Sequence, residues 1–258
     1  MTAIGAARLT GEITASTQAL ATLIDGADLN RPVPTCPEWT LRELAAHVGR
    51  VHRWAAQLVS TGAAQRLPFG GVPDRKLPAD PAQQPRWLRA GAERVLAALA
   101  EAGTRQVWTH LGPGPASYWL RRMAHETAVH RADAQVTFGQ RPVIDPDVAA
   151  DGIDEWLGFL AVDGPGQQER GLDDRWRGRA VHIHTTDGGQ GGGEWTVRGQ
   201  DGRIVVERGH SKGDVAVRGP ASAVLLVLVR RLPPSDPEVE VLGDRATFGD
   251  WLAATGFE

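Results

Sequence analysis

Up to about residue 163, hydrophobic positions recur at three- and four-residue steps, the pattern of amphipathic helices. It is clearest over residues 40–61, where Leu44 and Val48 share one face and Thr40 and Glu43 have the spacing of a capping box. Five helices are predicted, at residues 6–26, 40–61, 81–102, 115–139 and 147–162. Long helices with Pro- and Gly-rich connections predict an antiparallel four-helix bundle, with the fifth helix leading to a linker.

After about residue 178 the pattern changes to short β-branched runs separated by Gly-containing turns. An antiparallel meander is expected, with strands at residues 179–187, 194–199, 202–209 and 213–219. An apolar helix over residues 220–232, a short strand and a closing helix follow. The polar, Gly-rich segment 163–178 predicts the boundary between a helical domain, 1–163, and a smaller α+β domain, 164–258. The predicted fold class is therefore two-domain α+β.

Composition excludes several classes of protein. The 258 residues carry 28 basic and 31 acidic side chains, a net charge of -3, so neither nucleic acid nor an anionic membrane is an expected partner. One cysteine, Cys36, permits no internal disulfide, and we interpret it as a small half-buried residue rather than a nucleophile. No apolar run is long enough to span a membrane, which predicts a cytoplasmic protein.

The densest group of ionisable residues is HETAVHRAD, residues 125–133. It differs from the zinc motif H-E-x-x-H, because five positions place His125 and His130 about 140° apart around a helix. Glu126 and His130 are four positions apart, about 40° around the helix, and can bind one ion together. This face continues through Met123, Thr127 and Ala134, so both side chains are predicted to point into the bundle.

His47 lies in the apolar stripe of another predicted helix and is the natural third ligand. Two nitrogens and one oxygen suit an open site for Zn²⁺ or a similar divalent ion, with positions left for water or substrate. The alternatives are a lone core histidine and an ordinary Glu–His pair on a helix.

The neighbouring polar residues are assigned to other positions. His52 falls off the face of His47, and His125 and Arg131 are expected at the rim of the bundle. Asp133 is expected either to orient His130 or to face solvent. In the second domain, His182 and His184 alternate on one strand, which predicts an exposed strand face in preference to a two-ligand site.

Two segments carry a resemblance to a known family. CPEWTLRELAAHVGRVHRWA (36–55) and RMAHETAVHRADA (122–134) resemble the DinB-like, metal-binding four-helix bundle of mycothiol-dependent maleylpyruvate isomerases. HIHTTDGG and GDVAVRGPASAVLLVLVRRLPP are similar to that family's C-terminal domain, an α+β fold of the sterol-carrier type. The resemblance implies a divalent metal, typically zinc, on His47, Glu126 and His130, and an active-site arginine at Arg231, with Arg230 the close rival.

The resemblance also implies the chemistry. Mycothiol, as its thiolate, adds to the conjugated double bond of maleylpyruvate, the resulting single bond rotates, and elimination leaves the trans isomer. Arg231, expected at a cleft between the domains, would stabilise the enolate or hold a carboxylate. Partners are then a small electrophile and a low-molecular-weight thiol, with the chain a monomer or homodimer. The alternatives are a mycothiol S-transferase without isomerase activity and a non-catalytic metal- or ligand-binding protein.

Overall fold

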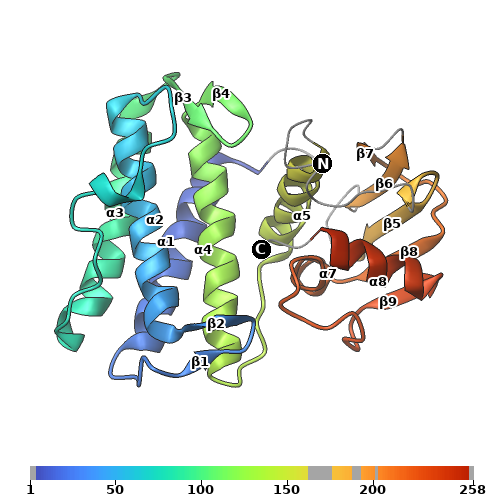
Figure 1. The fold of residues 1–258 in the computed structure, drawn as a ribbon, viewed down its shortest axis with the longest axis horizontal. Helices are drawn as coiled ribbons and strands as arrows, with labels where there is room; N and C mark the ends of the chain where they lie inside the picture. Colours follow the sequence, from blue (N-terminus) through green and yellow to red (C-terminus); the bar gives the residue numbers. More distant parts are fainter. Residues whose placement is uncertain (1–3, 162–175, 188–192, 201–202, 256–258) are drawn as a thin grey trace. The chain divides into compact units, whose positions relative to one another are not determined.

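The computed structural model describes residues 4–161, 176–187, 193–200 and 203–255 (Figure 1). The chain divides into two compact units, Ile4–Pro142 and Val143–Glu258, so the division precedes helix α5 (Pro146–Ala161). The sequence placed it after that helix, at residue 163. The structure groups α5 with the second unit because α5 packs against α7 (Ala221–Leu228) and β7 (Arg203–Arg208). The predicted linker falls largely on residues 162–175, outside the described residues.

The first unit is a four-helix bundle, as predicted, with small shifts at the helix ends (Figure 1). In it α1 packs against α3 and α4, and α2 packs against the same two helices. The helices are α1 (Ala6–Ile24), α2 (Leu41–Thr61), α3 (Gln84–Ala102) and α4 (Ser117–Thr137).

Helices α2 and α3 run parallel, which corrects the expectation of an antiparallel bundle. Arg105, just beyond the end of α3, donates to the carbonyl oxygen of Val59 near the end of α2 at 3.0 Å. The Trp108 amide likewise donates to Ala63 at 2.7 Å. The connection 62–83, with short 3₁₀ turns at Phe69–Gly71 and Pro81–Gln83, is long enough to return along the helix.

Two short hairpins, which the sequence pattern did not predict, precede α2 and α4. Strand β1 (Pro32–Val33) pairs with β2 (Cys36–Thr40), and β3 (Gln106–Thr109) pairs with β4 (Gly112–Pro115). Strand β2 leads directly into the predicted capping box, in which Thr40 and Glu43 exchange both hydrogen bonds. The local sequence therefore fixes the start of α2 and, about two turns later, the position of His47.

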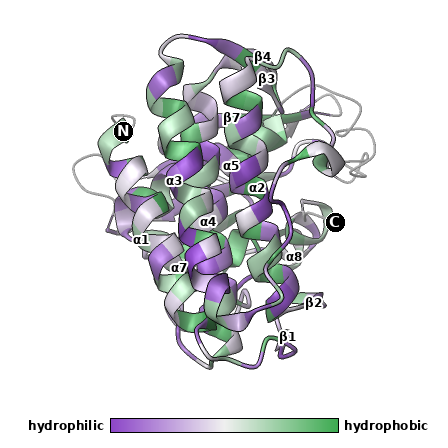
Figure 2. Ribbon diagram, turned by 90° about the vertical axis from the view of Figure 1, so that its left-hand side faces the viewer, coloured by the Kyte–Doolittle hydropathy of each residue, from purple (hydrophilic) through white to green (hydrophobic). Residues whose placement is uncertain are grey.

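The bundle interior has two apolar clusters separated by a polar layer. One cluster includes Trp54, Trp119 and Met123, and the other includes Leu44 and Leu88. Figure 2 shows hydrophilic and hydrophobic residues alternating around the bundle helices. Between the clusters, α2 and α4 contribute the polar residues of the candidate site, namely His47, His52, Glu126, Thr127, His130 and Asp133.

The second unit has a five-stranded sheet in the order β7-β6-β5-β8-β9, with β5 (Ala180–Thr185), β6 (Glu194–Gln200), β8 (Val215–Gly219) and β9 (Glu240–Gly243). Three pairings are antiparallel, which agrees with the predicted α+β class. The meander is confirmed for β5, β6 and β7, but wrong for β8, which pairs parallel to β5. Helix α8 (Arg245–Ala254) closes the unit. The Gly-containing turn expected between the strands at 179–187 and 194–199 falls mostly on residues 188–192, outside the described part.

Helix α7 ends at Leu228, four positions before the predicted end. The amide of Arg231 donates to the Leu226 carbonyl at 2.6 Å, and that of Arg230 donates to Val227 at 3.0 Å. With Arg230 at φ 62°, this is a Schellman ending, which uses the left-handed conformation to satisfy the last carbonyls. The two arginines therefore lie on a turn beyond the helix. None of the described helices is both long and apolar enough to cross a membrane.

Candidate metal centre

The structure brings His47, Glu126 and His130 together, from α2 and α4. Nε2 of His47 lies 2.8 Å from Oε1 of Glu126, and Nε2 of His130 lies 3.3 Å from the same oxygen. One ligand atom from each residue lies within 4.8 Å of the others. Their side chains are 21%, 18% and 10% exposed, so the cluster is mostly buried and keeps a small solvent-exposed part. Two imidazole nitrogens and one carboxylate oxygen suit a divalent ion such as Zn²⁺.

Asp133 orients His130. Its Oδ2 lies 2.8 Å from Nδ1 of His130, on the side of the ring opposite the cluster, and the carboxylate is fully buried. Thr35 and Cys36, from the loop and strand before α2, also contact Asp133, with the Thr35 hydroxyl donating at 2.5 Å and Cys36 Sγ at 3.6 Å. This is the carboxylate–histidine arrangement that fixes a metal-binding imidazole. Of the two roles the sequence left open for Asp133, the structure selects orientation of the ligand.

Two further residues, Arg122 and Trp39, complete the surroundings, and neither role was predicted from the sequence. Arg122 donates to Oε2 of Glu126 at 2.5 Å, one helical turn before it. The Trp39 ring lies 4.8 Å from the His47 ring and 5.7 Å from the His130 ring, between centroids. The i,i+4 spacing of Arg122 and Glu126 was a signal for the first contact. The Trp39 contact arises from the tertiary fold.

Electrostatics keep the carboxylate ionised. Burial alone would raise the pKa of Glu126, but Arg122, His130 and His47 hold it well below its usual value. Burial lowers the pKa of His47, partly offset by Glu126. For His130, the lowering by burial is outweighed by Asp133 and Glu126, which raise its pKa to about 9. A metal ion would therefore compete with one proton at His130 and meet a neutral His47.

Three other polar residues of α2 and α4 also had predicted positions, namely His52, His125 and Arg131. His52 lies outside the ligand group, as predicted, and its Nε2 is 2.8 Å from Thr127 Oγ1. His125 is buried at 4% exposure, so its expected position at the rim was wrong. Helix α4, which carries His125, packs against α1, α2 and α3, so residues on more than one of its faces are buried. Arg131 is partly buried and approaches Glu12 at 3.9 Å.

Arg230 and Arg231 differ in what they contact. The guanidinium of Arg230 donates to the carbonyls of Leu252 and Ala253 at the end of α8, which gives it a structural role. Nη1 of Arg231 donates to the carbonyl of Val229 at 2.8 Å. Both belong to the second unit, whereas the histidine cluster belongs to the first. The predicted role of Arg231 at the metal centre therefore stays a prediction.

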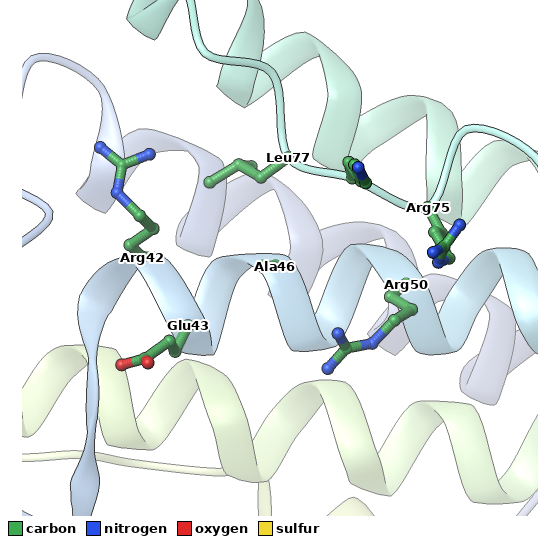
Figure 3. Close-up of a pocket in the computed structure, with 7 residues that line it drawn as sticks. Arg42, Glu43, Ala46, Arg50, Arg75 and Leu77 are labelled. Carbon is green, nitrogen blue, oxygen red and sulfur yellow. The ribbon is translucent and has the colours of Figure 1, made fainter. Parts of the chain in front are cut away.

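A basic cavity of about 410 Å³ lies along α2. Figure 3 shows Glu43, Ala46 and Arg50 on the helix, with Arg75 and Leu77 on the connection toward α3. Glu43 and Arg50 are one turn before and one turn after His47, on the same face. Four basic residues against one acidic residue make the cavity suitable for an anionic group. Its lining is Arg42, Glu43, Ala46, Arg50, Arg75, Lys76 and Leu77.

Solved structures of other proteins share this fold over most of the chain. Two crystal structures of the mycothiol-dependent maleylpyruvate isomerase, one of them a histidine-to-alanine variant, superpose with TM-scores of 0.60 and 0.61. Each is 13% identical, and the match covers 93% of both chains. A UbiJ-SCP2 ubiquinone synthesis protein matches 43% of this chain and 91% of its own at 18% identity, with a TM-score of 0.32 that establishes no shared fold. No curated protein matches by sequence.

Domain models of one family account for most of the chain. The mycothiol maleylpyruvate isomerase N-terminal domain matches residues 10–135, which include α2 and α4. The C-terminal domain of the same family matches residues 147–249, from the start of α5 into α8. Both matches agree with the resemblance found in the sequence. The chain therefore belongs to the mycothiol-dependent maleylpyruvate isomerase family.

Proposed function

We propose that this protein is a divalent-metal-dependent enzyme that activates a low-molecular-weight thiol, mycothiol, for addition to an electrophilic or α,β-unsaturated substrate. The observation that carries the proposal is the convergence of His47, Glu126 and His130, with Asp133 behind His130. Membership of a family whose solved enzymes are mycothiol-dependent isomerases supports the choice of thiol. We place the reaction in the cytoplasm, where such thiols are kept reduced.

The residues of the cluster have complementary tasks. An ion held by His47, Glu126 and His130, most suitably Zn²⁺, would supply the positive charge that keeps a thiol ionised at neutral pH. Asp133 accepts the Nδ1 proton of His130 and so directs Nε2 toward the cluster. Arg122 holds the second oxygen of Glu126 and restricts its rotation. The single cysteine, Cys36, is half-buried and hydrogen-bonded to Asp133. We therefore assign the reacting sulfur to the thiol cofactor.

The proposed addition places negative charge on the substrate carbonyl oxygen, and a cation near that oxygen would stabilise the charge. When the thiolate sulfur bonds to the alkene carbon β to the carbonyl, the alkene π pair shifts toward the carbonyl carbon and displaces the C=O π pair onto oxygen, which forms an enolate. Return of the electron pair after rotation about the single bond expels the thiolate, with no net proton change. We assign the enolate or a substrate carboxylate to Arg231, and the basic cavity containing Arg50 supports binding of a second anionic group.

Asp133→Asn tests the orientation of His130. The amide cannot accept the Nδ1 proton as well as a carboxylate does, so Zn²⁺ affinity should fall about 10- to 100-fold. Competition with a chromophoric chelator measures the change. Asp147→Asn, on helix α5 of the other unit, is the control and should bind Zn²⁺ like the unsubstituted protein. Unchanged affinity in Asp133→Asn would show that the carboxylate has no part in holding the metal.

A neighbouring pair of arginines tests the role of Arg231. Arg231→Ala should lower thiol-dependent kcat by about 100-fold, the effect of removing one group that stabilises developing charge. Arg230→Ala should instead lower the stability of the second unit, because it removes the contacts with the end of α8, and leave kcat near its original value. Steady-state kinetics and thermal unfolding of both variants separate these effects. The assignment fails if Arg231→Ala turns over normally.

The reaction itself is tested with a substrate panel. Zn²⁺-loaded protein is given mycothiol with maleylpyruvate, other cis α,β-unsaturated acids and simple electrophiles. Catalytic conversion of cis to trans acid supports the isomerase, and accumulation of a thioether supports the S-transferase. If no compound reacts while the metal is bound, the enzyme proposal fails and a non-catalytic binding protein replaces it.

A further inference from the structure

A second group of potential metal ligands lies on the sheet of the C-terminal unit. His182 of β5 stands opposite Thr196 of β6, and the next pair on that face is His184 and Glu194. His210, in the connection from β7 to β8, covers His182, with the rings edge to face and their centroids 4.9 Å apart. One potential ligand atom each from His182, Glu194 and His210 lies within 4.8 Å of the others.

His182 is the unexplained member of this group. It is only 6% exposed, which contradicts the exposed strand face expected from the sequence. Its Nε2 is buried and has no hydrogen-bond partner in the described part of the chain. A buried imidazole nitrogen without a partner loses its hydration and gains nothing in return. The unpartnered Nε2 of His182 therefore points to a ligand that would pair with it.

We propose that His182, Glu194 and His210 form a second divalent-metal site, with the ligand chemistry of Zn²⁺. Two nitrogens and one carboxylate oxygen leave at least one position open to water or to a ligand from solution. The site consists wholly of residues of the C-terminal unit and shares none with the His47 cluster.

The local charges favour a cation. Glu194 lies between two histidines, with Oε2 3.4 Å from Nδ1 of His210 and Oε1 3.6 Å from Nε2 of His184. Burial lowers the pKa of His182, which favours the neutral form of the ring. The basic residues nearest along the strands have acidic partners of their own, since Arg198 pairs with Glu207 and Arg218 with Glu240. In the described part of the chain, these two arginines therefore pair with other carboxylates, Glu207 and Glu240.

His210 is the residue to substitute, because its side chain is 77% exposed and its loss should leave the sheet intact. Zn²⁺ alone is titrated into the metal-free protein against a chromophoric chelator. The unsubstituted protein should bind two equivalents. His210→Ala and Glu194→Gln should each weaken one equivalent at least about tenfold. His110→Ala, which removes an exposed histidine of the bundle, is the matched control and should still bind two.

The two sites are separated by combining variants. Glu126→Gln should weaken the equivalent assigned to the bundle by about 100-fold or more, and in the double variant Glu126→Gln with His210→Ala both equivalents should be weakened. If the bundle site fails but the sheet site exists, the unsubstituted protein binds one equivalent that His210→Ala weakens. The proposal is overturned if His210→Ala and Glu194→Gln both titrate like the unsubstituted protein, or if every bound equivalent is lost in Glu126→Gln.

Discussion

Glu126→Gln is expected to lower the affinity of the bundle site for Zn²⁺ by about 100-fold or more. Changes to residues that merely orient a ligand cost 10- to 100-fold, and this one replaces a ligand itself. A neutral amide is a poorer ligand than a carboxylate, and the substitution leaves the charge of Arg122 without its partner at 2.5 Å. Thiol-dependent turnover should fall in parallel at limiting metal. Chelator competition and steady-state rates measure the two effects.

Glu93→Gln is the matched control, because Glu93 is exposed on α3. It should leave both metal affinity and turnover unchanged. Thermal unfolding in the presence of a chelator shows whether Glu126→Gln is folded, and addition of excess Zn²⁺ to the folded variant should restore part of the activity. Tight Zn²⁺ binding by Glu126→Gln at the bundle site would contradict the proposed ligand set.

The stability of the metal-free protein should fall steeply below pH 6.5, and His52 is a main cause. Burial lowers the pKa of His52 from 6.5 to about 4 in the folded state. Thr127 donates its hydroxyl proton to Met123, so its oxygen accepts the proton on Nε2 of His52, which suits a neutral ring. Between pH 6.5 and 4, His52 is protonated in the unfolded chain but stays neutral in the folded chain. The free energy of unfolding should therefore fall by about 3 kcal/mol as the pH drops through this range.

Urea unfolding from pH 8 to 4, with a chelator present, tests this expectation. His52→Gln should have a shallower dependence on pH than the unsubstituted protein, whereas His110→Gln should keep the original slope. His130 acts in the opposite direction and in another range. Its pKa is raised to about 9, so its contribution to stability is present below pH 6.5 and is lost as the pH rises toward 9. Equal slopes below pH 6.5 in His52→Gln and the unsubstituted protein would exclude His52 as the cause.

The candidate ligands could be predicted because helical geometry is regular. Four-residue spacing put Glu126 and His130 on one face, and an apolar stripe put His47 inside the bundle. What sequence spacing could not supply was contact between distant segments. Thr35 reaches Asp133 across 98 positions because a hairpin that the pattern did not predict folds against α4. The contact of the Trp39 ring with both histidine rings has the same origin.

The fold could be predicted as far as its local signals extend. Capping residues and periodicity gave the bundle helices, and hairpin signals gave the pairing of β5, β6 and β7. The parallel pairing of β8 with β5 depends on a connection that passes over two strands, which leaves no local signature. The end of α7 was missed because Arg230 takes a left-handed conformation that favours glycine, and the apolar run continues past it.

The central claim is that the bundle site binds a metal which in turn binds a thiol. Its most direct test is a titration of the Co²⁺-loaded His210→Ala variant with mycothiol, followed by absorption spectroscopy. We expect a sulfur-to-cobalt charge-transfer band that saturates at one thiol per centre. The band should be absent from the double variant that carries both His210→Ala and Glu126→Gln. A cobalt spectrum that does not change at saturating mycothiol would contradict it.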